Sequence, residues 1–296
     1  MERTLETIGE QLAARLAQRV DPRPAGRVHG GCISECYRWR SESGWLFVKI
    51  ADSSRFSMLE AEAAGLEELA EAAAVRVPRV LELGSAGEHA YLALEWIDLA
   101  SGSSDSAQAR LGEQLARQHR KSAERFGWHR DNTIGSTPQV NPWSSSWLGF
   151  FRDSRLRFQL ELAERNGFGG RLQVRGRELL DRIDTFFADH QPASSLLHGD
   201  LWGGNAAADG RGAPVIFDPA VYYGDREADL AMTRLFGGFS TAFYSAYEAA
   251  WPLPESARSR VDLYNLYHVL NHLNLFGGGY ARQAESMIER LLGVHR

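Results

Sequence analysis

The sequence predicts an α+β protein of two unequal lobes, a smaller β-rich lobe followed by a larger, mostly helical one. Alternating apolar residues and glycine turns dominate residues 28–97, with a single helical stretch among them. Helical patterns dominate the chain after that point. Small polar residues at 100–104 separate the two compositions and are typical of a hinge. We therefore expect one lobe at residues 1–98 and a second at residues 99–296.

The elements of the first lobe follow from local patterns. Apolar residues of the first twenty recur at helical spacing, which favours an amphipathic helix over a signal peptide. Residues 56–74 favour a second helix, which Pro78 ends. The expected strands are short runs bounded by glycine, serine or proline. They lie within residues 28–50, interrupted by turns at 30–31 and 43–44, and at 80–83 and 90–97. In the second lobe, a strand pair is expected within residues 205–217.

Composition excludes several classes of protein. The chain has 296 residues, with 33 Lys and Arg against 38 Asp and Glu, which gives a net charge of −5 and argues against a nucleic-acid partner. Two cysteines exclude a disulfide framework and fit a reducing compartment. No run of about 18 apolar residues suggests a membrane span. A cytoplasmic protein with no membrane partner is the expectation.

Asp200, Asn205 and Asp218 form the most informative cluster. Apolar residues lead into a glycine-bearing loop that carries Asp200, and Asn205 ends it. A hairpin over 205–217 would return the chain so that Asp218 lies beside Asn205. Phosphoryl transfer needs one carboxylate to accept the proton of the attacking hydroxyl and other oxygens to hold Mg²⁺. Asp200 suits the first role, and Asn205 with Asp218 suits the second.

Lys49 ends an apolar strand and needs a carboxylate partner. A phosphotransferase of this kind uses such a lysine for the nucleotide phosphates and holds it with a helical glutamate. Glu62 shares the apolar face of the following helix with Leu59 and Leu66, where a charge without a partner is costly. We therefore predict that Glu62 pairs with Lys49, with Glu60 as the alternative.

The positions of two further segments indicate contacts with a nucleotide. Gly30 and Gly31 form a turn before the lysine strand, where backbone N–H groups could cover phosphates. Glu95, Trp96 and Ile97 end the β-rich lobe just before the polar hinge. In a two-lobed nucleotide site, the backbone of that connector would contact the adenine edge.

Several motifs together resemble one known family. They lie at residues 30–35 (Gly-Gly-Cys-Ile-Ser-Glu), 47–49, 135–143, 198–205 (His-Gly-Asp-Leu-Trp-Gly-Gly-Asn), 214–220, 223–230 and 236–239. The sequence resembles the fructosamine kinase (ketosamine 3-kinase) family over essentially the whole chain. The segments at 30–35 and 198–202 separate this family from the broader aminoglycoside phosphotransferase-like group, which is similar in fold to the protein kinases.

The resemblance implies a protein-kinase-like fold and ATP-dependent phosphorylation of the sugar 3-hydroxyl of ketosamines. These are ribulosamines and fructosamines, the glycation adducts on small amines or protein lysines. The phosphorylated adduct then falls apart, so the activity promotes deglycation. The implied cofactors are ATP and Mg²⁺. The implied roles are Asp200 as catalytic base, Asn205 and Asp218 as metal ligands, and Lys49 with Glu62 as phosphate clamp.

The substrate side is predicted from fewer residues. Trp202, two residues past the base, could stack on the sugar or its amine, or could instead pack under the loop. The family likeness makes His272 a sugar contact. His119 is expected to be a hydrogen-bonded core histidine. Asp225 and Asp229 are expected to cap a helix and to brace the catalytic loop.

Cys32 and Cys36 would lie about 13 Å apart in an extended strand, too far apart for a mutual disulfide. A thiol at a phosphate-covering turn would sit in an electropositive field that favours the thiolate. Our hypothesis is that Cys32 is a redox-sensitive brake, so that the protein is a monomer or a redox-linked dimer. The alternative is two ordinary reduced cysteines.

Two other functions remain open at this level. One is a kinase of the same fold that acts on an aminoglycoside or choline, which would need an acidic pocket. Residues 128–147, with Gln139, Asn141 and three tryptophans, look better suited to a neutral sugar. The other is a nucleotide-binding pseudoenzyme, which the presence of Lys49, Asp200 and the two candidate metal ligands disfavours.

Overall fold

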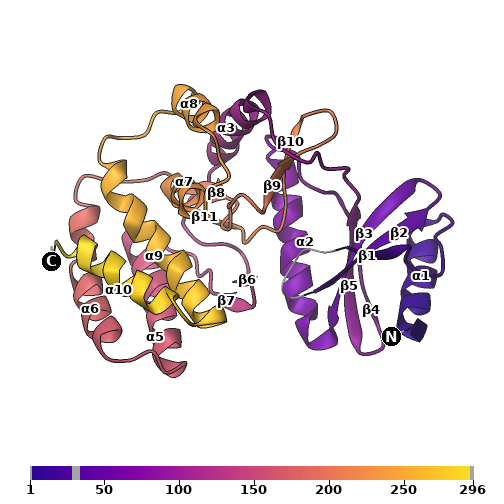
Figure 1. Cartoon of the computed structure of the whole chain (residues 1–296), viewed down its shortest axis with the longest axis horizontal. Helices are drawn as coiled ribbons and strands as arrows, with labels where there is room; N and C mark the ends of the chain where they lie inside the picture. The colour runs from indigo at the N-terminus through magenta and orange to yellow at the C-terminus, as the bar shows by residue number, and fades with distance from the viewer. Residues whose placement is uncertain (1, 29–33, 294–296) are drawn as a thin grey trace.

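A computed structural model, which describes residues 2–28 and 34–293, has the predicted two-lobed α+β architecture. The N-terminal lobe extends to Glu95 and the C-terminal lobe begins at Asp105, with residues 96–104 between them (Figure 1). The boundary that composition predicts, between residues 98 and 99, falls in this connector and stays a prediction. Among the described residues, no helix has both the length and the apolar character needed to cross a bilayer.

The N-terminal lobe is an antiparallel sheet in the order β1-β2-β3-β5-β4, covered by one helix on each face. Figure 1 shows α2 between the sheet and the C-terminal lobe and α1 on the opposite side. The bounds are α1 Glu2–Leu16, β1 Gly26–Val28, β2 Glu35–Ser41, β3 Gly44–Asp52, η1 Ser53–Arg55, α2 Phe56–Glu71, β4 Val80–Ala86 and β5 His89–Glu95.

Strand alternation assigns the residues of β3 to the two faces of the sheet. Leu46, Val48 and Ile50 pack with α1 in one buried cluster. Phe47 and Ala51 belong to the larger cluster that includes α2. Lys49 therefore faces α2, because successive side chains of a strand point to opposite faces.

Three elements of this lobe were predicted to extend further along the chain than they do. The first helix ends at Leu16 rather than at residue 20, because Ala17 adopts a left-handed φ of 50°. The second ends at Glu71, shortly before Ala73, which has a φ of 49°. The last strand ends at Glu95, so Trp96 and Ile97 lie in the connector rather than in the sheet.

The C-terminal lobe contains helices around a few short strand pairs. Its helical elements are α3 Asp105–His119, α4 Trp147–Phe151, the π-helical η2 Arg152–Arg157, α5 Phe158–Arg165, α6 Arg171–Asp181, η3 Ile183–Phe186, α7 Arg226–Leu235, α8 Thr241–Ala250, α9 Ala257–Phe276 and α10 Tyr280–Leu291. Its strands are β6 Asn132–Ile134, β7 Thr137–Gln139, β8 Ser195–Leu197, β9 Ala206–Ala208, β10 Pro214–Ile216 and β11 Tyr222–Gly224. Sequence patterns predicted the β9–β10 pair but not the β6–β7 and β8–β11 pairs.

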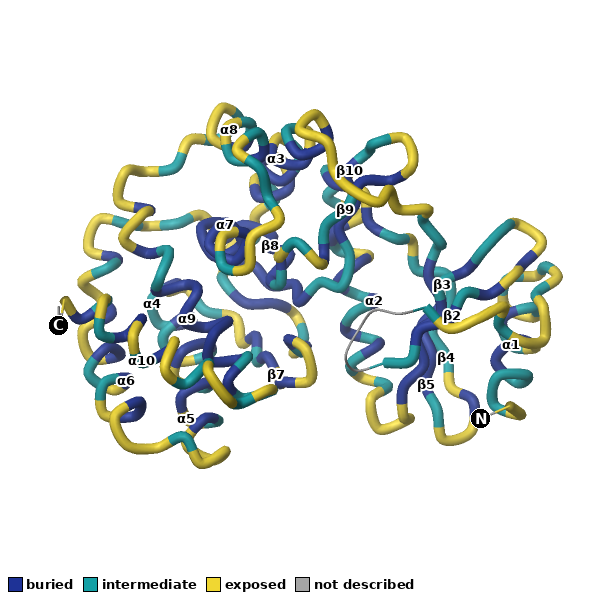
Figure 2. Tube along the Cα trace, in the orientation of Figure 1, coloured by how far each residue is buried: buried dark blue, intermediate teal, exposed yellow. Residues whose placement is uncertain are grey.

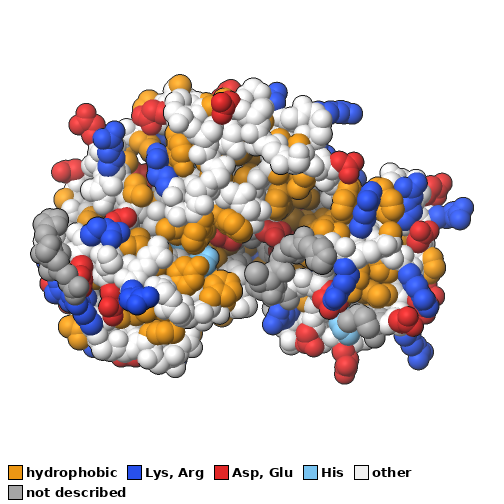
Figure 3. Space-filling view, in the orientation of Figure 1, with side chains coloured by type: hydrophobic (Ala, Val, Ile, Leu, Met, Phe, Trp, Pro, Cys, Tyr) orange, Lys and Arg blue, Asp and Glu red, His pale blue; other side chains and the backbone are white. Residues whose placement is uncertain are grey.

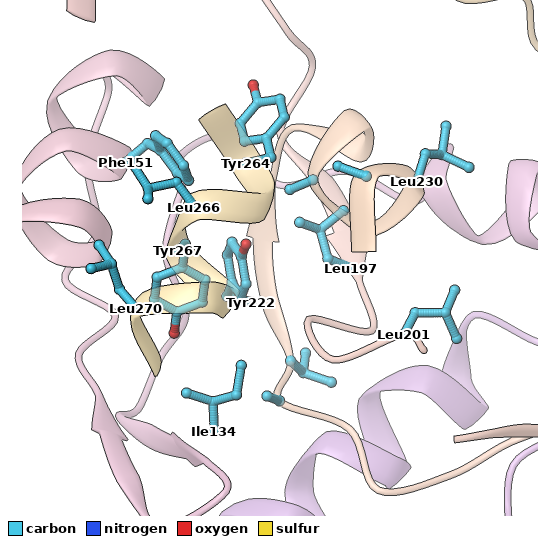
Figure 4. Packing of buried hydrophobic residues seen from close by; sticks show 14 of the residues in the cluster. Ile134, Phe151, Leu197, Leu201, Tyr222, Leu230, Tyr264, Leu266, Tyr267 and Leu270 are labelled. Atoms are coloured by element: carbon cyan, nitrogen blue, oxygen red, sulfur yellow. The ribbon is translucent and has the colours of Figure 1, made fainter. Parts of the chain in front are cut away.

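α9 lies at the centre of this lobe and is buried along most of its length (Figure 2). Tyr264, Leu266, Tyr267 and Leu270 of this helix pack among buried residues from several other segments (Figure 4). The β8–β11 pair lies beside α7 (Figure 1). This core fixes the loops on either side of β8 and β11, from which the candidate site is built.

Candidate active site

Lys49 reaches two carboxylates from its position on β3. Its Nζ atom lies 2.7 Å from an oxygen of Glu62 and 2.5 Å from an oxygen of Asp218. Burial alone would lower the pKa of Lys49, but these carboxylates outweigh that effect and raise it above its usual range. Lys49 is therefore a permanent cation. The pair with Glu62 that helix periodicity predicted is present, whereas Glu60, the alternative, bonds Arg130.

Asp200 lies on the loop after β8. The Nδ2 atom of Asn205 donates to the backbone oxygen of Asp200 at 2.9 Å and to its carboxylate at 3.3 Å. Burial and then the negative charge of Asp218 raise the pKa of Asp200 to about 7. The site therefore holds a carboxyl group that can exchange its proton near neutral pH.

The β9–β10 hairpin brings Asn205 and Asp218 together, as the spacing predicted. Phe217 N donates to the backbone oxygen of Asn205 at 3.1 Å, and Asn205 Nδ2 lies 3.4 Å from the backbone oxygen of Asp218. Because Nδ2 faces these acceptors, Oδ1 of Asn205 lies at the other end of the amide. That oxygen and the part-exposed carboxylate of Asp218 are of the kind that Mg²⁺ prefers, so these residues fit a magnesium site.

Asp229 on α7 supports the loop that carries Asp200. Its carboxylate accepts hydrogen bonds from the backbone N–H groups of His198 (2.7 Å) and Gly199 (2.9 Å). His119 Nε2 lies 3.1 Å from the same carboxylate, and its Nδ1 lies 2.8 Å from the hydroxyl of Tyr247. His119 is thus the hydrogen-bonded core histidine that was predicted, and Asp229 is the predicted brace.

Position 199 requires glycine because the backbone of another segment passes close to it. Gly199 has a φ of 81°, and a Cβ there would lie 2.0 Å from the backbone oxygen of Ala220. Asp225 also has its predicted role, because its side chain accepts from Glu227 N at the start of α7. The loop, the helix start and the segment after Asp218 are therefore one packed unit.

The side chains of the connector hold it to neighbouring segments, and the predicted contact of its backbone with the adenine edge stays a prediction. The Glu95 carboxylate bonds Arg76 at 2.8 Å and accepts from Arg79 N at 3.3 Å, so this side chain holds the connector rather than facing a ligand. Trp96 donates from Nε1 to Asp98 at 2.7 Å. The connector backbone then pairs with the β9–β10 hairpin through Asp98 and Ala100. The role predicted for Ile97 likewise stays a prediction.

Phe47 and Arg38 belong to this region, although sequence reasoning missed them. The rings of Phe47 and Trp96 lie 6.4 Å apart, and the Arg38 guanidinium lies 4.7 Å from the centre of the Trp96 ring. Phe47 precedes Lys49 by two residues, so strand alternation places both on one face of the sheet. That alternation was the signal that could have found it.

An aromatic shelf extends outward from Asp200. We define it as Trp202, Phe236, His272 and Phe276, whose successive ring centres lie 6.3, 4.8 and 5.6 Å apart. Trp202 and Phe236 are each 40% exposed and Phe276 is 57% exposed. Figure 3 shows hydrophobic side chains gathered on the larger lobe next to acidic ones in the hollow between the lobes. Trp202 and His272, predicted separately, therefore belong to one surface, and Phe236 with Phe276 completes it.

His272 presents a defined tautomer on this shelf. Its Nδ1 lies 2.8 Å from the backbone oxygen of His268, so Nδ1 carries the proton and Nε2 is left as an acceptor. Burial lowers the pKa of His272, which keeps the ring neutral at neutral pH.

Comparison with known proteins agrees with this geometry. The sequence matches the family model described as fructosamine kinase over residues 4–294. The chain belongs to the fructosamine kinase family. It is accordingly an ATP-dependent phosphotransferase that acts on a hydroxyl group.

Two curated relatives match most of this chain. A probable ketoamine kinase of Synechocystis sp. is 44% identical over 98% of this chain and 97% of its own. A chloroplastic protein-ribulosamine 3-kinase of Arabidopsis thaliana is 43% identical over 90% of this chain and 82% of its own.

Solved structures give the same fold. The crystal structure of a Haemophilus somnus protein assigned as a fructosamine-3-kinase has a TM-score of 0.87 at 29% identity and covers 96% of each chain. An aminoglycoside phosphotransferase crystallised with ADP and hygromycin B has a TM-score of 0.65 at 14% identity and covers 97% of this chain and 98% of its own. The second likeness shows the protein-kinase-like fold alone.

Three predicted positions, Gly30, Gly31 and Cys32, lie outside the described residues, so the phosphate turn and the redox brake stay predictions. Cys36 is described and is buried on β2. Burial raises the pKa of its thiol to about 11, which keeps it protonated at neutral pH.

One expectation about the sugar site was wrong. Gln139 and Asn141 are each 1% exposed and bond other parts of the protein, so they do not face a substrate. Trp128 and Trp147 are also buried, so Trp143 is the one of the three tryptophans that reaches the surface. The tract looked suited to a sugar because the local sequence does not show which amides the tertiary fold will cover.

His190, Asp225 and Glu227 are the group of three described residues close enough to hold a metal ion. Their ligand atoms already have partners, however, because Tyr264 donates to Asp225 at 2.5 Å and Arg260 bonds both oxygens of Glu227 at 2.8 Å. The Arg260 cation would also repel a metal ion. This group therefore serves the start of α7 rather than catalysis.

Proposed function

We propose that this chain is a ketosamine 3-kinase that transfers the γ-phosphate of ATP to O3 of ribulosamines or fructosamines, with Asp200 as general base. The observation that carries the proposal is the convergence of Asp200, Asn205 and Asp218 with the Lys49–Glu62 pair. A permanent cation, a proton acceptor and two metal-type oxygens are the parts that phosphoryl transfer requires.

In the proposed reaction, Asp200 accepts the proton of the sugar 3-hydroxyl. The O3 oxygen forms a bond to the γ-phosphorus while the bond from that phosphorus to the β,γ-bridging oxygen breaks, and ADP leaves. A base with a pKa near the working pH combines sufficient ionisation with sufficient driving force for proton transfer, and the pKa of about 7 for Asp200 meets this condition.

Lys49 would hold the nucleotide phosphates, with Glu62 fixing its position. Asn205 and Asp218 would hold Mg²⁺, which neutralises charge on the phosphates when it is bound. Because Lys49 bonds Asp218 directly at 2.5 Å, the two groups that would meet the phosphates already lie together in the protein alone. This preorganisation supports rapid transfer once ATP is present.

The aromatic shelf would bind the rest of the ketosamine. The secondary amine of a ketosamine is protonated near neutral pH, and aromatic faces such as Trp202 and Phe236 attract a cation. Nε2 of neutral His272 would accept a hydrogen bond from a sugar hydroxyl or from that ammonium group. The exposed outer end of the shelf at Phe276 leaves room for a small amine or a protein lysine as carrier.

An aminoglycoside or choline substrate is not favoured. The structures that suggest it share only the fold, at 13–18% identity. The chain instead matches the fructosamine kinase model over residues 4–294, and relatives that cover most of it are named for ketoamines and ribulosamines.

A side-by-side assay tests the proposal. ATP consumption is measured with a ribulosamine, a fructosamine and an aminoglycoside as acceptors, with the Asp200→Asn variant as control. We expect ATP-dependent turnover on at least one ketosamine, none on the aminoglycoside, and none with the variant. Absence of turnover on both ketosamines would overturn the proposed function.

A further inference from the structure

Three buried amide side chains hold the backbone just after Asp218. They are Asn132, Gln139 and Asn141, which we call the amide network. Gln139 Nε2 donates to the backbone oxygen of Ala220 at 3.1 Å and to Asn132 Oδ1 at 2.8 Å. Asn132 Nδ2 donates to the backbone oxygen of Val221 at 2.7 Å. Two successive carbonyl groups of the segment that carries Asp218 are thus fixed from one side.

Other side chains orient the amides. Tyr267 of α9 donates its hydroxyl to Gln139 Oε1 at 2.6 Å, which turns Nε2 toward Ala220. In Figure 4 the hydroxyl of Tyr267 points toward the side on which Ile134 lies. Asn141 Nδ2 lies 3.0 Å from Asn132 Oδ1, so each amide of the network has a defined orientation.

Arg155 anchors the network at an energetic cost. It is fully buried and donates to Asn141 Oδ1 at 2.6 Å and to the backbone oxygen of Val140 at 2.7 Å. No described carboxylate lies within ion-pair distance of it, and its Nε has no hydrogen-bond partner among the described residues. The guanidinium instead stacks 4.2 Å from the centre of the Tyr222 ring.

A buried cation without a carboxylate partner opposes folding. Arg155 also lies in η2, and π-helical segments occur frequently at functional sites. Both features indicate that the network holds a particular local backbone conformation and does not mainly add to the stability of the whole fold.

The backbone conformation that the network holds is that of Asp218. Asp218 has a φ of 55°, a left-handed conformation that is uncommon outside glycine. Such a conformation persists only where the surrounding structure over-determines it. Upstream, Phe217 N bonds Asn205 O. Downstream, Ala220 N donates to His198 O at 2.8 Å and Ala220 O receives Gln139.

We propose that the amide network, oriented by Tyr267 and anchored by Arg155, positions Asp218 for metal binding by holding the two residues Ala220 and Val221. Gln139 and Tyr267 are positioning residues, because they act on Asp218 through the backbone and touch no substrate. The inference rests on the proposed function, in which Asp218 is a ligand of Mg²⁺.

Binding of Mn²⁺ in the presence of ADP, followed by electron paramagnetic resonance, tests the inference. Gln139→Glu replaces the donor to Ala220 with an acceptor and should weaken Mn²⁺ binding about 10-fold, as is typical when support for a metal ligand is lost. Tyr267→Phe removes one hydroxyl and should weaken binding less, in the same direction. In both variants the amide of Ala220 should exchange its hydrogen faster, while KM for the ketosamine stays the same.

Tyr244→Phe is the matched control. Tyr244 donates to Thr233 at 3.1 Å, outside the network, so its loss should leave Mn²⁺ binding unchanged. If Gln139→Glu does not fold, Tyr267→Phe decides the question, because deletion of a hydroxyl leaves the packing intact.

The Asp218→Asn variant distinguishes a failure of the proposed function from a failure of the inference about the amide network. If Asp218→Asn binds Mn²⁺ as tightly as the wild type, the proposed ligand is wrong and the proposed function fails at this residue. If Asp218→Asn weakens binding but the folded network variants do not, the inference alone is overturned. Weaker binding in Asp218→Asn and in the network variants, with the control unchanged, supports both.

Discussion

Lys49 on the N-terminal lobe is buried and Asp200 on the C-terminal lobe is part-buried. Both are ionisable groups of one site, yet their surroundings have opposite effects on a charge. Lys49 has two carboxylates within 2.7 Å, and they raise its pKa. Among the described residues, the carboxylate of Asp200 has only the amide of Asn205 as a hydrogen-bond partner, and burial beside Asp218 raises its pKa to about 7. The first environment stabilises a permanent charge, and the second resists one.

The difference corresponds to two chemical tasks. A group that holds phosphates must stay charged throughout turnover, and an ion pair with Glu62 ensures this. A general base must take up and release a proton, which an ion pair with a cation would hinder by lowering its pKa. The predictions below test whether these two environments are as different as the structure indicates.

Loss of the base should have the largest effect. We expect Asp200→Asn to lower kcat roughly 10³-fold, because the amide cannot accept the proton of the sugar hydroxyl. Binding of ADP, measured by calorimetry, should survive because the Lys49 side of the site is intact. Turnover near the wild-type rate would show that Asp200 is not the base.

Loss of the clamp should cost stability as well as activity. Lys49→Met leaves Glu62 and Asp218 without their cation, which we expect to lower the free energy of unfolding by about 3 kcal/mol. Urea unfolding at pH 8 without nucleotide measures this. Lys121→Met is a matched control, because the chain has only two lysines and Lys121 makes looser ion pairs at the surface. Equal losses in the two variants would contradict the account of Lys49.

Loss of an aromatic face beside the base should affect the substrate and not the nucleotide. We expect Trp202→Ala to raise KM for the ketosamine about 10-fold, the size of one cation–aromatic contact, with KM for ATP unchanged. Initial rates, with the concentration of each substrate varied in turn, give the two KM values separately. Trp143→Ala, which removes another part-exposed tryptophan outside the shelf, should change neither constant.

The smallest expected effect is on stability as a function of pH. Asp200 has a raised pKa in the folded protein, so between about pH 4 and 7 the unfolded chain is ionised there while the folded protein is not. The unfavourable contribution of Asp200 therefore grows over this range and is constant above pH 7. Asp200→Asn should raise Tm slightly at pH 8, and this gain should vanish near pH 4. A lower Tm at pH 8 would show that the Asp200 environment does not resist charge.

Local patterns predicted the parts of the site that lie close together in the sequence. The hairpin between Asn205 and Asp218 and the inward face of α2 that carries Glu62 follow from turn residues and helical period. The shelf could not be found in this way, because Phe236 follows α7 and Phe276 ends α9, and these residues join one surface with Trp202 only after the C-terminal lobe has packed. The amide network was misread for the same reason, since Gln139 and Ala220 are distant in sequence.

The position of the phosphate on the product tests the central claim most directly. The product formed from a ribulosamine and ATP is followed by phosphorus–proton correlation in nuclear magnetic resonance during turnover. We predict a phosphate on O3 of the sugar, formed by the wild type and absent with Asp200→Asn. A phosphate on another oxygen, or hydrolysis of ATP with no sugar phosphate, would contradict the account.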